Sequence, residues 1–441
     1  MSFNTNRIDE IFSEWDKPTS PGCALAVIRD GEIIYKRGYG MADLERSVPI
    51  TPGSLFDLGS TGKQFTAAII AILENRGYLS LDDCVRKYLS EMPGYADAIT
   101  LRHLIHHTSG LRDYLTLMDL CGLPDENLYS EEELLDLIVR QRGLNFSPGE
   151  EYLYSNSGYF LLGVIAQRVT GQHLTDLIQE HIFTPLGMNR STFNKDYRPI
   201  VRGRALSYEK SDDGNFTNKL SLCGGTGDGP IYSSVEDLFL WDQNFYDNKL
   251  NHAQSDLLDT LHTQGVLNNG KTISYAGGLS IDDYRGFKSV SHGGSWAGYR
   301  SELLRFPKQG FSVICLSNLA STVPEELACR VADAFFETEF EGIPIPALTE
   351  EEEPEPESIS ITTEQASQFV GTYTNSELNT DYVLSMQGDQ LHLQRNRFAT
   401  PEALQAIAPD AFKGKDIQLH FANNSLSVSS GRVKNIEFTK T

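Results

Sequence analysis

The chain has 441 residues, enough to bury a sizeable core and to form about two or three domains. Its formal net charge is −23. Because phosphate binding requires a basic face, this charge argues against a nucleic-acid partner and equally against docking on an anionic membrane. The six cysteines form no C-x-x-C pair in a chain too long to need disulfide stapling, so we expect reduced, mostly structural thiols.

The amino-terminal residues 1–12 contain no basic stretch followed by an apolar run, so they lack the pattern of a secretory signal. The longest apolar runs, such as FTAAIIAIL at 65–73, are too short to cross a membrane. We therefore expect a cytoplasmic protein without membrane partners. A periplasmic location stays open if an export signal belongs to a longer form of the chain.

The first predicted elements are a short amphipathic helix over residues 3–15 and a β-hairpin. The segment GCALAVIRDGEIIYKRGYG has two strand-like runs around Asp30-Gly31, and Asp-Gly between apolar segments is a strong hairpin signal. A helix that begins near Ser60 follows, and it ends before Gly77, the residue type that commonly follows a helix. Strands before and after this helix indicate a sheet flanked by helices.

Ser60 and Lys63 stand at the start of this helix, which is apolar at nearly every position from Phe65 to Leu73. At this spacing the two side chains lie on one helix face within reach of each other. An apolar environment disfavours the charged form of a lysine, so a lysine there can accept a proton. A nucleophilic serine needs such an acceptor.

The rest of the chain continues this mixed pattern. Residues 81–192 are mostly helical in pattern, and residues 207–229 are polar and glycine-rich, which indicates loops. A helix is expected at 234–245, strands at 275–281, 287–293, 299–306 and 311–318, and a closing helix at 324–340. The last two strands flank a Pro-Lys-Gln-Gly turn, so we expect them to pair as antiparallel neighbours.

Composition divides the chain into three parts. Residues 1–342 form the first domain, residues 343–360 are an acidic linker rich in proline and glutamate, and residues 361–441 form a second domain. The second domain has short alternating segments separated by turns, which are typical of a small all-β barrel or sandwich. The fold class is therefore α/β (α+β), with an antiparallel sheet, a helical block and a carboxy-terminal β-barrel.

Ser-x-x-Lys alone is weak evidence, because roughly two chance matches are expected in a chain of this length. The chain has two, Ser60-Lys63 and Ser207-Lys210. The second lies in polar loop sequence with nothing to shield it. Context therefore favours the first.

A nucleophilic serine also needs a proton path to the leaving group and donors for the developing oxyanion. A Tyr-x-Asn motif can supply the proton path, and the chain has three such triplets: Tyr154-Asn156, Tyr246-Asn248 and Tyr373-Asn375. Only the first of them follows a Ser-Pro-Gly turn and precedes an apolar helix, which predicts a rigid corner. His292-Gly293-Gly294-Ser295 ends a predicted strand, and its glycines let the backbone approach a ligand closely.

These motifs resemble those of the serine β-lactamase-like superfamily, in the branch with class C β-lactamases, D-alanyl-D-alanine carboxypeptidases, D-aminopeptidases and related esterases. FDLGSTGKQFTA, LIHHTSGL, FSPGEEYLYSNSGYFLLG, HIFTPLGM and SHGGSWAGY occur in the family's order over roughly residues 20–340. The resemblance implies that residues 1–342 are a serine hydrolase domain. The carboxy-terminal β domain resembles, with a weaker match, the lipocalin-like modules of some D-aminopeptidase-like members.

The resemblance also implies roles for individual residues. Ser60 would be the acyl-forming nucleophile, Lys63 its proton acceptor or cationic modulator, and Tyr154 the shared acid and base. Whether Lys63 or Tyr154 takes the serine proton stays open. Asn156 would orient Lys63 and the substrate amide.

The third motif of the resemblance is the His292 strand. The backbone N–H groups of Ser60 and Ser295 would form the oxyanion hole, with Gly294 beside them. His292 would stand where β-lactamases have a lysine. Because histidine is only partly charged near neutrality, recognition of β-lactams or of a terminal carboxylate is in doubt, and the His-Gly-Gly form is more typical of D-aminopeptidases and some esterases.

The sequence thus predicts a serine hydrolase that works through an acyl-enzyme on small amides, peptides containing D-amino acids, or esters, without a metal or an organic cofactor. A short-chain carboxylesterase or a weak β-lactamase is the alternative, and a sensor or scaffold that is acylated without turnover is the alternative of another class. His103 and His107 have the spacing of a helical zinc pair, but the glutamate of the zincin pattern is missing, so we expect a hydrogen-bonded turn at 106–110.

We consider two hypotheses for the carboxy-terminal β domain. In the first it serves for packing or for homo-oligomerisation. In the second one of its loops reaches the mouth of the active site and limits the size of the substrate. The expected partners are a small molecule or a short peptide as substrate.

Overall fold

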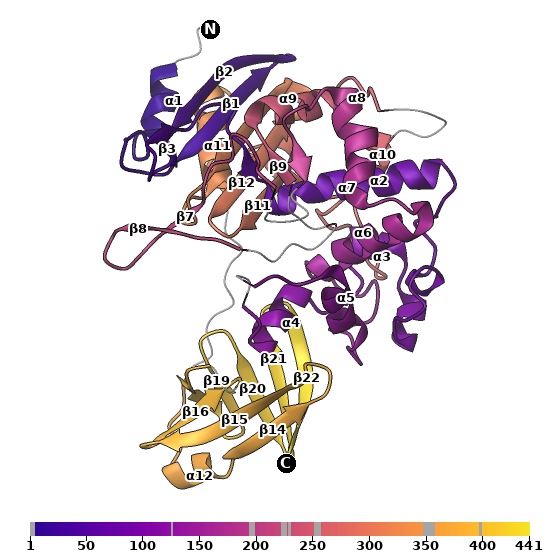
Figure 1. Cartoon of the computed structure of the whole chain (residues 1–441), viewed down its shortest axis with the longest axis vertical. Helices are drawn as coiled ribbons and strands as arrows, with labels where there is room; N and C mark the ends of the chain where they lie inside the picture. The colour runs from indigo at the N-terminus through magenta and orange to yellow at the C-terminus, as the bar shows by residue number, and fades with distance from the viewer. Residues whose placement is uncertain are drawn as a thin grey trace. The chain divides into compact units, whose positions relative to one another are not determined.

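The computed structural model in Figure 1 describes most of the chain. The described residues are 5–124, 127–193, 199–221, 227, 231–250, 257–346, 358–396 and 399–441. Cys223 and most of the predicted linker, residues 347–357, lie outside them. No helix within these ranges is both long and apolar enough to cross a membrane.

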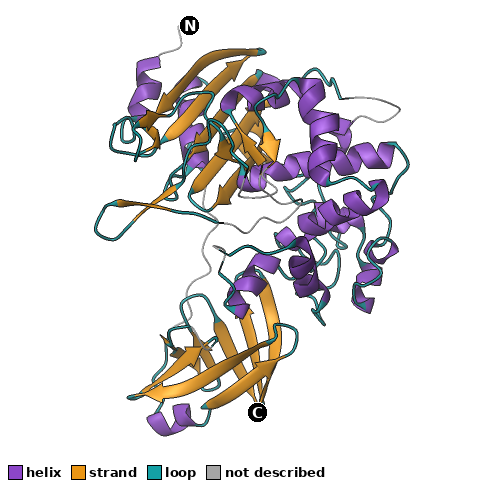
Figure 2. Ribbon diagram, in the orientation of Figure 1, coloured by secondary structure: helices purple, strands orange, loops and turns teal. Residues whose placement is uncertain are grey.

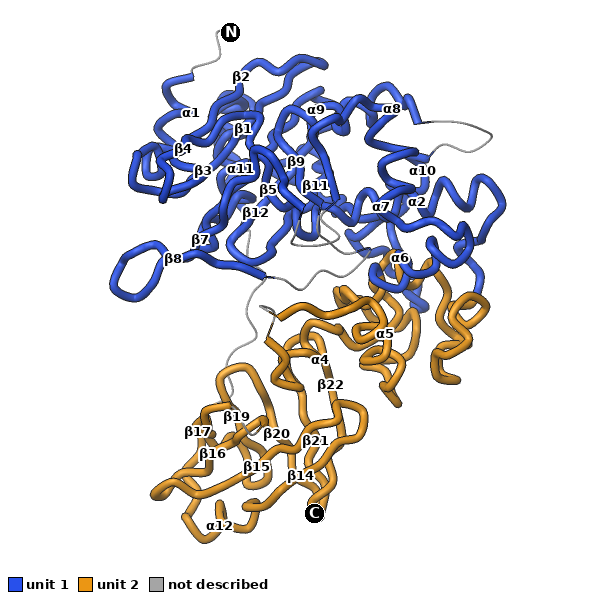
Figure 3. The backbone as a smooth tube through the Cα atoms, viewed as in Figure 1, with its two compact units in different colours: residues 1–83, 159–348 blue, residues 84–158, 349–441 orange. Residues whose placement is uncertain are grey.

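The chain forms two compact units, each built from two separate stretches of sequence (Figure 3). Unit 1 comprises residues 1–83 and 159–348, and unit 2 comprises residues 84–158 and 349–441. The carboxy-terminal β domain thus belongs to one unit with part of the predicted helical block. The three-part division at residues 342 and 361 stays a prediction.

Unit 1 begins with one helix, a set of strands and the buried helix α2. Their bounds are α1 Thr5–Phe12, β1 Cys23–Arg29, β2 Glu32–Tyr39, β3 Met41–Asp43, β4 Val48–Pro49, β5 Phe56–Asp57, a 3₁₀ turn Gly59–Gly62 and α2 Lys63–Asn75. After the excursion into unit 2 the chain continues with helices and short strands. These are α6 Asn156–Thr170, whose first residues belong to unit 2, α7 Leu174–Ile178, a π-helical turn Gln179–Phe183, α8 Thr184–Leu186, β6 Thr192–Phe193, β7 Tyr208–Lys210, β8 Phe216–Asn218, β9 Ile231–Ser233, α9 Val235–Asn244 and α10 Leu257–His262.

The last part of unit 1 completes its main sheet. It contains β10 Ser280–Tyr284, β11 Phe287–Trp296, β12 Tyr299–Phe306, β13 Phe311–Ser317 and α11 Pro324–Phe335. The sheet has the order β10-β11-β12-β13-β1-β2 and is antiparallel at every pairing (Figure 2). The predicted Asp30-Gly31 hairpin and the antiparallel pair flanking Pro307 are confirmed.

The hairpin turn has positive φ at both of its central residues, 49° at Asp30 and 84° at Gly31, as a two-residue turn between twisted strands requires. One face of the sheet packs against α1 and α11 through alternate residues such as Leu25 and Val27 of β1. The helix α9 contacts β1 and β13. Because the central strands are covered, β1 is buried at nearly every position.

Two elements begin later than the sequence predicted. The α-helix starts at Lys63, and Ser60 lies on a 3₁₀ turn before it, which hydrogen bonds to β11 and from β12 hold in place. The strand predicted from residue 275 starts at Ser280. Gly278 has a φ of +71° and a Cβ there would lie 2.7 Å from the Lys63 carbonyl carbon, so the chain bends at this point against α2.

Unit 2 combines short helices with a nine-stranded sheet. The helices are α3 Leu101–Ile105, α4 Tyr114–Cys121, α5 Glu131–Val139 and α12 Thr363–Ser367. The strands are β14 Gly371–Asn375, β15 Thr380–Gln387, β16 Gln390–Gln394, β17 Glu402–Ala403, β18 Gln405–Ala408, β19 Ala411–Lys413, β20 Gln418–Ala422, β21 Ser425–Ser430 and β22 Val433–Lys440.

The order of this sheet, β17-β16-β15-β14-β22-β21-β20-β19-β18, brings consecutive strands to its two edges. Only Leu404 separates β17 from β18, so the sheet curls into a nearly closed barrel, as predicted. Alternation places Tyr382 and Leu384 in its interior. The sequence missed β17 to β19 because these strands are short and weakly alternating.

The barrel contacts the helical part of unit 2 through polar groups. The Tyr382 hydroxyl donates to the Leu120 carbonyl at 2.9 Å, and Arg395 pairs with Asp119 at 2.9 Å. The cysteines of the described ranges, at positions 23, 84, 121, 315 and 329, carry free thiols, as predicted.

Candidate active site

Ser60 and Lys63 contact each other directly. The Lys63 Nζ donates a hydrogen bond to the Ser60 Oγ at 3.0 Å. Lys63 is fully buried at the start of α2, and every residue of this helix through Leu73 is buried. The Lys63 ammonium lies 5.8 Å from the centroid of the Tyr159 ring. The predicted serine–lysine pair is therefore formed, with the serine half-buried and the lysine shielded from water.

The Ser60 turn is fastened to the neighbouring sheet by two hydroxyl groups. Thr61 Oγ1 donates to the His292 carbonyl at 2.9 Å and contacts the Ser301 hydroxyl at 2.9 Å. Ser301 in turn donates to the Leu58 carbonyl at 2.7 Å. These bonds hold β11 and β12 against the segment that carries the candidate nucleophile.

Glycines allow the two backbones to approach at this point. Gly59 has a φ of +50°, and a Cβ there would lie 2.8 Å from the Ser295 nitrogen. A Cβ on Gly294 would lie 1.9 Å from the Leu58 carbonyl oxygen, so no other residue fits without moving the backbone. The Ser295 backbone thus runs beside the Ser60 turn, as an oxyanion hole made of their N–H groups requires.

His292 is held in β11 by a partner on each ring nitrogen. Its Nδ1 lies 2.6 Å from the Gly293 carbonyl oxygen, which can only accept, so Nδ1 carries the proton. Its Nε2 then accepts from the Tyr275 hydroxyl at 2.9 Å. The pKa of His292 is lowered to about 4, mainly by burial; the Gly293 bond opposes this shift, and the positive charge of Lys63 contributes to it. An exposed histidine would be partly charged near neutrality, but His292 is neutral.

We expect His292 to make the protein less stable as the pH falls from 7 to 4. A histidine in the unfolded chain titrates near pH 6.5, so in this window the unfolded chain binds a proton that the folded chain excludes. The advantage of the wild type over His292→Gln in the free energy of unfolding should shrink by about 2–3 kcal/mol between pH 7 and about pH 4.5, measured by urea unfolding.

Two buried carboxyl groups titrate in the same range, but they do not disturb this comparison. Burial raises the pKa of Asp57 to about 7 and that of Glu302 to about 8. Both groups are present in the wild type and the variant, so their contributions cancel in the difference. A difference between the two proteins that stays constant with pH would show that His292 is not held neutral.

Tyr154 and Asn156 lie in unit 2, on a corner fixed by buried polar side chains. The Ser155 N–H donates to His107 Nδ1 at 3.1 Å. The Asn156 N–H donates to the Asp113 carboxylate at 2.6 Å, and Asp113 also caps α4. The predicted rigid corner at the start of α6 is therefore present.

The Tyr154 ring packs against two basic side chains. Its centroid lies 4.1 Å from that of the His107 ring, and the Arg432 guanidinium carbon lies 4.6 Å from the Tyr154 centroid. Arg432 belongs to the turn between β21 and β22, far from this corner in sequence. Sequence patterns do not indicate Arg432, Asp113 or Tyr275 as parts of the site; only the N-cap position of Asp113 before α4 has a local signal.

The predicted site residues therefore fall into two groups. Ser60, Lys63, His292, Gly294 and Ser295 come together in unit 1. Tyr154 and Asn156 stand together in unit 2. A reaction that uses both groups is a proposal, made below.

The two histidines with the spacing of a zinc pair, His103 and His107, have structural partners. His103 Nδ1 accepts from the Thr100 N–H at 3.2 Å in a capping box, and His107 lies beyond the end of α3 with a φ of +55°. The two side chains thus do not form a helical pair. Within the described ranges, no group of three or more histidine, cysteine, aspartate or glutamate side chains is placed to hold a metal ion.

The other Ser-x-x-Lys and Tyr-x-Asn motifs of the chain do not form comparable sites. The Ser207 hydroxyl donates to the Lys219 carbonyl, and Lys210 is exposed three residues on, in a strand rather than a helix. Tyr373 is buried in the barrel, where its hydroxyl donates to the Phe369 carbonyl at 2.9 Å, and Tyr246 is 44% exposed.

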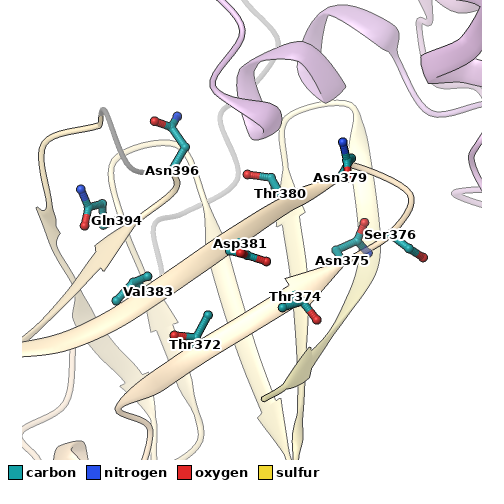
Figure 4. Close-up of a pocket in the computed structure, with 10 residues that line it drawn as sticks. All are labelled: Thr372, Thr374, Asn375, Ser376, Asn379, Thr380, Asp381, Val383, Gln394 and Asn396. Atoms are coloured by element: carbon teal, nitrogen blue, oxygen red, sulfur yellow. The ribbon is translucent and has the colours of Figure 1, made fainter.

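A polar pocket of about 820 Å³ lies on the barrel, against β14 and β15 (Figure 4). Hydroxyl and amide side chains line it, among them Thr372, Thr374 and Gln394, and Asp381 is its acidic group. It contains no residue of either predicted group. The pocket is therefore distinct from the candidate active site.

Comparison with known proteins agrees with this geometry. The model of the family "Beta-lactamase" matches residues 8–336. A D-aminopeptidase of Gluconobacter oxydans (strain 621H) is 30% identical over 358 residues, which are 81% of this chain and 63% of that protein, so the chain spans less than two thirds of that relative's length. A penicillin-binding protein of Bacillus subtilis (strain 168) is 30% identical over 392 residues, 85% of this chain and 83% of that protein.

The fold agrees as well. The octameric penicillin-binding protein homologue from Pyrococcus abyssi has a TM-score of 0.69 and 23% identity, with 99% of this chain and 100% of that chain covered. At this identity the likeness concerns the fold alone, and it includes the barrel. Because the family model spans most of the sequence and the serine–lysine pair is formed, the chain belongs to the Beta-lactamase family.

Proposed function

We propose that the protein is a serine hydrolase that cleaves small amides and peptides of D-amino acids through an acyl-enzyme on Ser60. The observation that carries this proposal is the 3.0 Å hydrogen bond between Lys63 Nζ and Ser60 Oγ at the start of a buried helix. A half-buried serine bonded to a shielded lysine has the arrangement of an activated nucleophile. The name of the Gluconobacter relative, a D-aminopeptidase, supports the substrate class.

In the proposed reaction the Ser60 oxygen attacks the substrate carbonyl carbon, and its proton passes to Tyr154 or to Lys63 in its neutral form. The N–H groups of Ser60 and Ser295 stabilise the oxyanion of the tetrahedral intermediate. Tyr154 then gives a proton to the leaving nitrogen as the carbon–nitrogen bond breaks. Water attacks the resulting ester and releases the acid.

Asn156 and the Asp113 carboxylate have a supporting role in this proposal. The bond from the Asn156 N–H to Asp113 holds the turn that presents Tyr154. The Asn156 side chain orients Lys63 and the substrate amide. The proposed reaction uses no metal and no organic cofactor.

The neutral His292 supports the order in which we place the substrates. A cation at the third motif favours a substrate carboxylate in that place, and His292 is uncharged there. We therefore place D-amino-acid amides and peptides first, short-chain esters second and β-lactams third.

A substrate panel tests this order. D-alanine p-nitroanilide, p-nitrophenyl butyrate and nitrocefin are each assayed with the wild type, and Ser60 is mapped by mass spectrometry after reaction with a fluorophosphonate probe. We expect the highest kcat/KM with the anilide and labelling of Ser60. Rapid nitrocefin turnover would reverse the order, and stable acylation without product would instead indicate a sensor.

We also propose that the protein self-associates through its carboxy-terminal barrel. The octameric state of the Pyrococcus abyssi homologue supports self-association. Light scattering of the full chain would measure the mass of the assembly. The expected cytoplasmic location stays a prediction.

A further inference from the structure

The backbone that leads to Ser60 is fixed up to Leu58. The short strand β5 pairs antiparallel with β9, and after it the Leu58 N–H donates to the Ile231 carbonyl at 2.9 Å. Gly59 is the single residue between this fixed backbone and Ser60. The orientation of the candidate nucleophile therefore depends on how Gly59 is held.

A buried carboxyl group holds Gly59. The Gly59 N–H donates a hydrogen bond to the Asp57 Oδ1 at 2.9 Å, which is the bond that an aspartate makes to the backbone two residues on in a tight turn. The Asp57 side chain is only 2% exposed. Because a glycine adopts positive and negative φ with similar ease, this bond helps to select the φ of +50° that Gly59 has.

The conformation of Gly59 sets the direction of the Ser60 N–H. The peptide group that joins the two residues carries this N–H, so a rotation of the Gly59 backbone turns the N–H and shifts the serine hydroxyl with it. The Ser295 nitrogen would lie 2.8 Å from a Cβ on Gly59, so the second N–H of the proposed oxyanion hole belongs to the backbone packed against this glycine. Both donors thus depend on the Gly59 turn.

We propose that Asp57 is a positioning residue that aims the Ser60 N–H and hydroxyl by accepting the Gly59 N–H. This inference rests on the proposed function, in which Ser60 attacks the substrate and its N–H stabilises the oxyanion. Asp57 acts through Gly59 and touches no substrate. Donors that must point at a developing charge lose most of their effect when they are turned away, so the loss of the Gly59 bond should slow the chemical step more than it weakens substrate binding.

The positioning role needs an acceptor oxygen rather than a negative charge. Burial raises the pKa of Asp57 to about 7, while the Gly59 bond and the charge of Arg204 oppose this shift. Among the described residues, the other titratable groups that act on Asp57 are the hydroxyls of Tyr232 and Tyr299. A carboxyl group keeps an oxygen that accepts from the Gly59 N–H whether it is ionised or protonated, so an amide of the same shape should replace it.

Two substitutions of similar volume test this proposal in the full-length protein, Asp57→Asn, which keeps the acceptor, and Asp57→Leu, which removes it. With D-alanine p-nitroanilide we expect Asp57→Leu to lower kcat about 10²-fold and to change KM by less than about twofold. Asp57→Asn should keep kcat within about threefold of the wild type. The rate constant for labelling of Ser60 by the fluorophosphonate probe should fall in parallel with kcat, because the tetrahedral adduct uses the same N–H donors.

A second buried carboxylate of unit 1 gives a matched control. Asp237 on α9 is 6% exposed and accepts from the N–H groups of Arg190 at 2.9 Å and Ser191 at 2.7 Å, so it also fixes a turn, but not the Ser60 turn. Asp237→Ala should keep kcat and the labelling rate within about twofold per folded molecule. If Asp57→Leu does not fold by circular dichroism, the smaller Asp57→Ala, which also lacks the acceptor, takes its place.

The outcomes distinguish this role from the proposed function. An Asp57→Leu variant as fast as the wild type, an Asp57→Asn variant as slow as Asp57→Leu, or an equal loss in Asp237→Ala would overturn the role of Asp57 and leave the hydrolase intact. A wild type that neither is labelled at Ser60 nor turns over any substrate of the panel would overturn the proposed function, and the role of Asp57 with it.

Discussion

Ser60→Ala is expected to lower kcat/KM for D-alanine p-nitroanilide by at least about 10⁴-fold. The covalent step has no substitute when the hydroxyl is removed, because Lys63 cannot itself form the ester through which water releases the acid. The fluorophosphonate probe should then label no residue at this position. Spectrophotometric turnover and intact-mass spectrometry measure the two effects.

The second Ser-x-x-Lys of the chain gives a matched control. The Ser207 hydroxyl bonds only a backbone carbonyl among the described residues, and Lys210 is exposed. Ser207→Ala should keep turnover within about twofold and should still be labelled. Full activity in Ser60→Ala, or equal losses in the two variants, would reject the assignment of the nucleophile.

Asp242→Ala is expected to destabilise unit 1 by about 3–5 kcal/mol in the free energy of unfolding. Asp242 on α9 accepts a hydrogen bond from Arg305 Nε of β12 at 2.8 Å, and both side chains are buried. The Arg305 guanidinium also lies 3.8 Å from the Phe245 ring centroid. Removing the carboxylate leaves a buried positive charge without its counterion, and urea unfolding at neutral pH measures the cost.

An exposed ion pair between β2 and the same helix, α9, is the control. Lys36 and Glu236 form an ion pair at 2.5 Å, but both side chains are more than one third exposed. Glu236→Ala should therefore cost less than about 1 kcal/mol. The double variant Asp242→Leu with Arg305→Met should recover most of the loss; a double variant as unstable as Asp242→Ala would show that the cost comes from packing rather than charge.

Local sequence patterns predicted the elements whose determinants are neighbours in the chain. The Asp30-Gly31 turn, the buried helix before Gly77 and the strand pair around Pro307 each depend on a few adjacent residues. The start of the α-helix at Lys63 instead of Ser60 was not predicted. The 3₁₀ turn before it depends on hydrogen bonds to β11 and β12, which no local pattern contains.

The candidate site shows the same distinction. Ser60 and Lys63 were identified because their spacing and the apolar helix are local features. The sequence indicated His292 as a histidine that is partly charged near neutrality. The structure holds it neutral, since its charge depends on burial and on the positive charge of Lys63, which lies on another segment. The hydrogen bond from the Asn156 N–H to the Asp113 carboxylate joins residues 43 positions apart, so no local pattern indicates it.

The family motifs, the secondary structure near them and the contact of Ser60 with Lys63 follow from local sequence, because side chains three positions apart meet where the chain is helical. Which groups are charged and which are neutral depends on the tertiary fold. Burial and long-range hydrogen bonds set those states, and they hold His292 neutral. They also place Arg432 over the Tyr154 ring, from 278 positions away in the sequence.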